Sequence, residues 1–67
     1  MTKAIIWEGL WGSWFVAKIT KIDAIGDVLD TITVSHGFLS LDEAKTWAKE
    51  NNYEIVKVQK YNDHSYT

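Results

Sequence analysis

The sequence predicts a small α+β domain, in which an antiparallel sheet of three or four strands carries one helix on one face, in the order β-β-β-α-β. Two observations predict this class. Residues 14–22 and 28–35 alternate between apolar and polar side chains, as strands do when one face is covered. Residues 41–51 repeat their apolar positions at helical spacing. A chain of 67 residues forms one domain, which we expect over residues 1–61, with a polar tail at 62–67.

The first two strands form a predicted hairpin. Residues 4–8 are rich in β-branched and aromatic side chains, which favour a strand. Residues 9–13 follow as the turn, because Gly9 and Gly12 can supply positive φ. In residues 14–22 the alternation separates two faces. We expect the core face to carry Phe15, Ala17 and Ile19, and the half-exposed face to carry Trp14, Val16, Lys18 and Thr20.

A second predicted hairpin leads into the third strand. Residues 23–27 have the length of a common hairpin loop and hold Gly26 near its end. Residues 28–35 then place Ile32 and Val34 on an apolar face, opposite a face that is largely hydroxylic. One covered face and one open face are typical of an antiparallel sheet.

The helix has a clear start. Ser40 and Glu43 have the spacing of a capping box, and Leu39 and Ala44 are placed to form a hydrophobic staple. The sequence therefore predicts a helix over residues 41–51. Its buried stripe comprises Leu41, Ala44, Trp47, Ala48 and Asn51.

The helix is expected to end at Asn51 and Asn52, because asparagine tolerates the left-handed cap. Trp47 is expected at the centre of the interface between helix and sheet. Residues 53–61 form the last predicted strand, with Val56 and Val58 facing the helix.

Composition excludes several classes of protein. Lysine and arginine total 7 against 9 acidic residues, and a formal net charge of −2 disfavours a nucleic-acid-binding protein. Without cysteine there is no disulfide framework and no thiolate metal site. Glu8 interrupts the apolar start of the chain, and no apolar run approaches the ~20 residues of a membrane span. We therefore expect a complete cytoplasmic protein with no membrane partner.

The polar residues do not form a recognisable catalytic or metal-binding pattern. His36 and His64 have no acidic partners at ligand spacing, and the serines lack a patterned histidine and aspartate. Asp23, Asp27 and Asp30 gather near one hairpin end, where aspartate commonly serves the turn. We expect no enzyme activity, no metal and no cofactor.

Aromatic residues provide the strongest surface signal. Trp7, Trp11 and Trp14 fall within eight positions, with Leu10 beside Trp11 at the turn. They form either an exposed interaction patch, since tryptophan is enriched at interfaces, or a second small core on the far side of the sheet. The candidate partner-binding residues are Leu10, Trp11, Trp14, Lys18, Lys57 and Tyr61. The last four share the expected open face of the sheet with Thr20, Thr31, Thr33 and Ile55, where aromatic rings and lysines could also contact nucleic acid.

The run Phe38-Leu39-Ser40-Leu41-Asp42-Glu43-Ala44-Lys45-Thr46-Trp47-Ala48 resembles the strand-to-helix junction of the arm-binding N-terminal domains of phage tyrosine recombinases. It is also similar to short bacterial and phage proteins of unknown function that share this order of elements. The resemblance covers residues 14–58. It implies three antiparallel strands before one helix, and a DNA-binding sheet face that would here carry Trp14, Lys18, Thr33 and Lys57. Those recombinase domains are basic, whereas this chain is acidic.

These observations favour a small non-enzymatic binding protein. Its size and its resemblance to phage proteins indicate an accessory protein of a phage or mobile element that binds and modulates a host protein, in the host cytoplasm. One alternative is a nucleic-acid-binding module that uses the open sheet face. Another is a domain that self-associates through its edge strands, for which a homodimer is one possible form.

Overall fold

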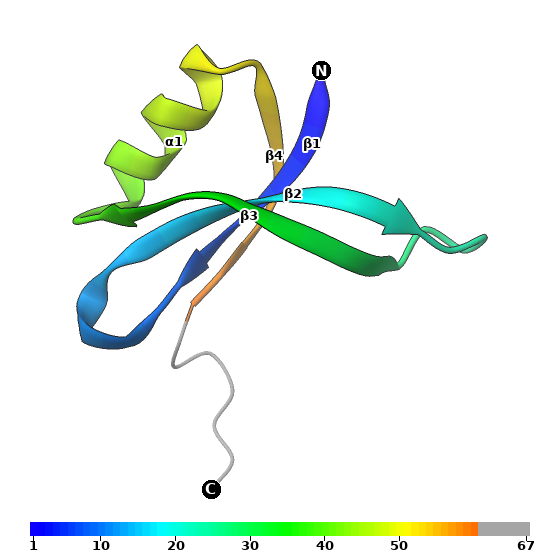
Figure 1. Ribbon diagram of the computed structural model, residues 1–67, viewed down its shortest axis with the longest axis horizontal. Coiled ribbons are helices and arrows are strands. Elements are labelled where there is room, and N and C mark those ends of the chain that lie inside the picture. The colour runs from blue at the N-terminus through cyan, green and yellow to red at the C-terminus, as the bar shows by residue number, and fades with distance from the viewer. Residues whose placement is uncertain (61–67) are drawn as a thin grey trace, which may run out of the picture.

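The computed structural model describes residues 1–60 and has the predicted α+β architecture, a four-stranded sheet with one helix against it (Figure 1). The element order β-β-β-α-β is confirmed, with a short 3-10 helix inside the first hairpin. The elements are β1 (Thr2–Glu8), η1 (Leu10–Gly12), β2 (Trp14–Ile22), β3 (Val28–Phe38), α1 (Leu41–Glu50) and β4 (Tyr53–Gln59). The predicted tail at 62–67, and the boundary drawn after Tyr61, lie outside the described residues.

The sheet is mixed rather than wholly antiparallel. Its strand order is β3-β2-β1-β4, and β2 is antiparallel to both of its neighbours, but β4 pairs with β1 in parallel. The expectation of a fully antiparallel sheet is therefore wrong for this pair. The reason is the helix, which carries the chain back along the sheet so that Tyr53 starts beside Thr2 and both strands run the same way.

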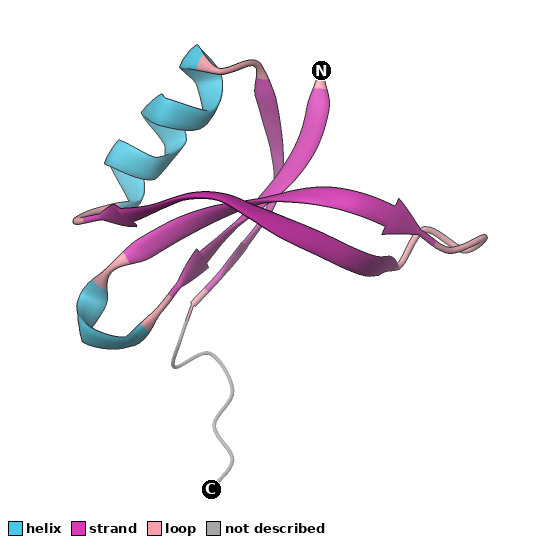
Figure 2. Cartoon of the chain, viewed as in Figure 1, coloured by secondary structure: helices cyan, strands magenta, loops and turns pink. Residues whose placement is uncertain are grey.

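The core lies between α1 and one face of the sheet, while no helix formed by residues 1–60 lies over the opposite face (Figure 2). Ala4, Ile6, Val16 and Ala44 are fully buried at its centre. Half-buried apolar side chains surround them: Trp14, Val34, Phe38, Leu41, Trp47, Tyr53, Ile55 and Val58.

The two faces of β2 are the reverse of those predicted. Val16 belongs to the buried cluster and Trp14 packs against it, so these two residues face the helix. Phe15 lies on the face away from the helix. Ala17 is also buried on that side, so both faces of the strand are apolar. Alternation therefore separates the faces correctly without showing which one the helix covers.

A β-bulge in β4 changes which of its side chains face the helix. β1 pairs first with Ile55 and then with Lys57, which leaves Val56 as an extra residue. Ile55 and Val58 consequently pack against the core, and Val56 is exposed. The prediction was right for Val58 and wrong for Val56.

The Ser40 cap of the helix is confirmed, but the reciprocal bond of the capping box goes to Leu39, the residue before the cap, rather than to Ser40 itself. The Ser40 hydroxyl accepts a hydrogen bond from the Glu43 backbone N–H at 3.1 Å, and the Glu43 carboxylate accepts one from the Leu39 N–H at 2.9 Å. The predicted staple does not form. The Leu39 side chain is 80% exposed, whereas Ala44 is buried against the sheet.

Trp47 flanks the helix–sheet interface rather than filling its centre. The fully buried helix positions are Ala44 and Ala48, whose small side chains allow the helix to approach the strands closely. The half-buried Trp47 ring lies between Phe38 and Tyr53, with centroid distances of 5.9 and 5.7 Å. Three aromatic rings therefore close one side of the interface.

Candidate interaction surface

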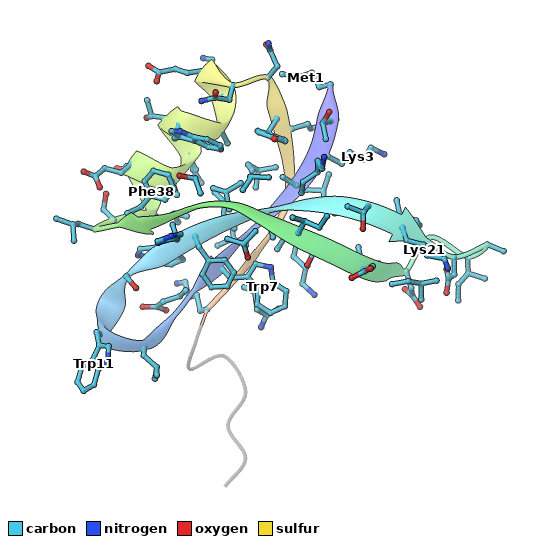
Figure 3. The ribbon with its side chains drawn as sticks, viewed as in Figure 1. Met1, Lys3, Trp7, Trp11, Lys21 and Phe38 are labelled. Carbon is cyan, nitrogen blue, oxygen red and sulfur yellow. The ribbon has the colours of Figure 1, made fainter. Side chains whose placement is uncertain are left out.

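The turn between β1 and β2, residues 9–13, carries a large side chain that is more exposed than any other large apolar side chain in residues 1–60, at a position where the backbone is strained. This hairpin tip holds Trp11 with 96% of its surface exposed and Leu10 with 55% exposed. Trp11 has φ 64° and ψ 21°, the left-handed region, and Gly12 follows with φ 74°. Gly9 instead has φ −97°, so the expectation that both glycines supply positive φ is wrong. Figure 3 shows the Trp11 indole projecting away from the sheet.

Hydrogen bonds fix the backbone of the hairpin tip. The Gly9 N–H donates to the Ser13 carbonyl at 2.7 Å. The Ser13 N–H and hydroxyl both donate to the Leu10 carbonyl, at 3.4 and 3.2 Å. The tip thus holds Leu10 and Trp11 outward on a defined turn.

The three neighbouring tryptophans do not form one patch. Trp7 stacks on Phe15 on the face away from the helix, with ring centroids 6.1 Å apart. Its indole N–H is buried and has no hydrogen-bond acceptor among the described residues. Trp14 instead packs against the core beneath the helix. A second small apolar cluster therefore exists around Trp7, Trp14 belongs to the main core, and Trp11 alone is fully exposed.

The remaining predicted binding residues lie on different faces. Lys18 is half-buried and pairs with Ala4, which places it on the helix side together with Trp14. Lys57 is exposed and pairs with Ile5 on the opposite side. Tyr61 lies outside the described residues. The expected shared face of Trp14, Lys18 and Lys57 is therefore wrong.

A second apolar surface was not anticipated from the sequence. β1 pairs with β2 only from Trp14 to Lys18, so residues 19–31 continue outward as a two-stranded ribbon, here called the β2–β3 arm (Figure 1). The arm exposes aliphatic side chains along its length, Ile22, Ile25, Val28 and Leu29, and Ile32 is exposed at its base. The available signal was the unequal length of the predicted strands, since the first was the shortest.

A groove of about 670 Å³ lies between the arm and the open face of β1 and β4. Ile5, Trp7, Val28 and Leu29 contribute to its apolar lining, and its charged lining residues are Asp23, Asp27 and Lys57. Figure 3 labels Trp7 on the open face and Lys21 on the arm.

Another groove, of about 450 Å³, runs beside α1. The rings of Phe38 and Trp47 line it together with the acidic side chains of Asp42, Glu43 and Glu50. Glu43 already accepts the hydrogen bond from the Leu39 N–H at the helix start. The groove is thus partly a consequence of helix capping.

Aspartate carboxylates of the arm accept hydrogen bonds from backbone N–H groups in and beside its turn. The Asp23 carboxylate accepts hydrogen bonds from the N–H groups of Ile25 and Asp27 at 3.0 and 2.8 Å, as expected for a turn aspartate. Asp30 accepts one from the Thr31 N–H at 2.9 Å. Within residues 1–60, no three histidine, aspartate or glutamate side chains gather in a way that could hold a metal ion. His64 lies outside that range.

No helix in the described part of the chain combines the length and the apolar character needed to cross a membrane. Comparison of the chain with protein-family models, with curated proteins and with solved structures finds no match.

Proposed function

We propose that this protein acts by binding another protein, without chemistry of its own, and that the hairpin tip anchors the contact. The observation that carries this proposal is Trp11, a tryptophan that is 96% exposed on a backbone with φ 64°. The proposal extends to a partner from a host cell only through the resemblance of the strand-to-helix junction to phage proteins.

Neither the backbone conformation nor the side chain of Trp11 stabilises the fold. A left-handed conformation costs a residue with a Cβ atom roughly 1–2 kcal/mol. The exposed indole buries almost no apolar area in return. Strain of this kind is typical of functional positions, and tryptophan is among the residues enriched at the centres of protein interfaces.

The tip is also suited to binding because it is ordered in advance. Its hydrogen bonds between Gly9, Leu10 and Ser13 hold the turn before any partner arrives. A preordered aromatic anchor loses little conformational entropy on binding. The complementary surface would be an apolar pocket that takes the indole, with Leu10 contacting its rim.

A capture experiment tests this proposal. Immobilised wild type and the variants Trp11→Ser and Leu39→Ser would be exposed to lysates of candidate host bacteria. Leu39 is a matched control, because it is a large exposed side chain that does not belong to the hairpin tip. We expect a partner that both wild type and Leu39→Ser retain and that Trp11→Ser loses, with all three proteins folded by circular dichroism.

Two results would contradict the proposal. Equal capture by Trp11→Ser would show that the tip is not the anchor. Binding of single-stranded DNA that weakens steeply with salt would favour the nucleic-acid alternative, because release of counterions from phosphates produces that dependence.

A further inference from the structure

We infer that the β2–β3 arm clasps a second copy of this chain, so that the arm of each copy lies in the groove of the other. The inference is independent of the hairpin tip and of the protein partner proposed above. It rests on the exposed aliphatic residues of the arm, on the groove beside it and on the charges that line that groove.

The arm lacks an apolar cover within the described residues. It extends past the last β1–β2 pair, Ala4 with Lys18, as a ribbon of only two strands. Two-stranded hairpins are at best marginally stable by themselves in water. Ile25 at the turn is nevertheless 82% exposed, and Leu29 in β3 is more than half exposed. Burial of these side chains by a second molecule would stabilise the arm, whose aliphatic residues are exposed to solvent in the monomer.

The groove and the arm have complementary surfaces. The groove is about 670 Å³, a volume that accommodates several side chains rather than one. Ile5 and Trp7 line it from β1, and Val28 and Leu29 line it from the arm itself. Because one wall of the groove is the arm, two arms that enter each other's grooves bury the aliphatic residues of both copies at once. This reciprocity is the defining feature of a two-fold interface.

Charge also favours a second copy. The charged residues that line the groove are Asp23, Asp27 and Lys57, and the Asp23 carboxylate already accepts hydrogen bonds from the N–H groups of Ile25 and Asp27 within the turn. The Asp27 carboxylate at the turn of the arm and Lys57 on the open face therefore remain for a contact between copies. In the clasp, Asp27 of each copy would meet Lys57 of the other, which gives two equivalent pairs of opposite charge.

Pairing through the β3 edge is the less favoured route to a dimer. Gly37, Val34 and Leu29 are each skipped in the register with β2, so the edge is irregular along its length. The Asp30 carboxylate accepts the hydrogen bond of the Thr31 N–H within the arm. Bulges and charged residues are devices that protect edge strands from pairing.

Sedimentation equilibrium across micromolar to millimolar concentration tests the inference. Wild type is expected to dimerise, and Ile25→Ser to weaken the dimer about tenfold or more. Leu39→Ser is the matched control, since Leu39 and Ile25 are both about four-fifths exposed, and it should sediment as wild type. Trp11→Ser should also leave the dimer intact. A wild type that is monomeric throughout, or equal effects of Ile25→Ser and Leu39→Ser, would overturn the clasp.

A mixing experiment identifies the contact itself. Asp27→Lys and Lys57→Asp should each weaken self-association, because each places like charges opposite one another in a homodimer. A mixture of the two variants should form heterodimers. In each heterodimer the native Asp27 of one copy faces the native Lys57 of the other, and the two substituted side chains, a lysine and an aspartate, face each other, so both pairs are attractive. No recovery on mixing would contradict an intermolecular contact between residues 27 and 57. Loss of the dimer in Trp11→Ser alone would overturn the clasp and would leave the hairpin tip as a binding anchor for a second copy.

Discussion

The indole of Trp7 stacks on the ring of Phe15, with centroids 6.1 Å apart and planes inclined by only 7°. The two residues are direct partners in the β1–β2 register, on the face of the sheet away from the helix. Ile5 and Ala17 form the neighbouring pair on the same face, and both are buried. The sheet therefore has an apolar cluster on each face, and in the described part of the chain a helix covers just one of them.

Removing the Phe15 ring should weaken the fold measurably. Phe15→Ala is expected to lower the free energy of unfolding by about 2 kcal/mol, less than the 3–5 kcal/mol of a fully buried ring because Phe15 is half-buried. Trp7→Phe should change it by less than about 1 kcal/mol, because it retains a ring and removes a buried N–H that has no acceptor in the described residues. Urea denaturation measures both. Equal losses in the two variants would mean that the indole contributes packing that phenylalanine cannot replace.

Trp47 provides a test of the helix–sheet interface. Trp47→Ala should lower the free energy of unfolding by about 3 kcal/mol, because it removes the ring between Phe38 and Tyr53. Lys45→Ala is the control, since Lys45 lies on the exposed side of the same helix and alanine favours helix. Thermal denaturation followed by far-ultraviolet circular dichroism would compare them. Similar melting temperatures would show that the aromatic group contributes little.

The capping box can be separated into its two hydrogen bonds. Ser40→Ala removes the acceptor of the Glu43 N–H and should cost about 1 kcal/mol. Glu43→Ala removes the acceptor of the Leu39 N–H and should cost less, because alanine at this helical position favours the helix and offsets part of the loss. Glu43→Gln keeps an acceptor oxygen and should fall between wild type and Glu43→Ala in chemical denaturation. A neutral Ser40→Ala would contradict the role of this hydroxyl.

The elements were predictable where their signals are local. Ser40 and Glu43 determine the helix start within four residues, and the turn at residues 23–27 forms where glycine and aspartate favour it. Asn52 has φ 64°, as expected for a residue that ends the helix. These features depend on hydrogen bonds between close neighbours in the chain, which a single sequence displays.

The face of β2 that meets the helix and the direction of β4 could not be predicted from local signals. Both faces of β2 are apolar, so the pattern of Phe15 and Val16 could not show which one meets the helix. The bulge at Val56 depends on pairing with β1, which lies about fifty residues earlier in the chain. The parallel pairing of β4 likewise follows from the path of the whole chain after the helix. Such features arise from long-range contacts.

In the candidate site as well, the local features could be predicted from the sequence and the long-range features could not. Trp11 sits between Leu10 and Gly12 in a turn, and its exposure followed from that local context. The placement of Trp14 depended on the face of β2 and was wrong. The β2–β3 arm was missed because its exposure results from β1 ending its pairing at Lys18, a long-range feature that the sequence indicates only through the unequal lengths of the predicted strands.

Trp14 and Trp11 should consequently respond differently to substitution. Trp14→Thr is expected to lower the free energy of unfolding by about 2–3 kcal/mol, because Trp14 packs against the core. Trp11→Ser should leave it nearly unchanged. Chemical denaturation of the two single variants measures this difference directly. A stable Trp14→Thr protein would mean that the indole adds little to the core.

The hairpin tip allows strain and binding to be measured separately. Trp11→Gly should raise the free energy of unfolding by up to about 1 kcal/mol, because glycine adopts positive φ without the cost that a Cβ atom imposes. Trp11→Ala removes the indole but retains the Cβ atom, so its stability should stay near that of wild type. Both variants should lose the partner that Leu39→Ser retains. If Trp11→Gly were clearly less stable than Trp11→Ala, the left-handed backbone would not be strained, and the argument from strain to function at this residue would fail. If both kept the partner, the exposed indole would not be the anchor, whatever their stabilities.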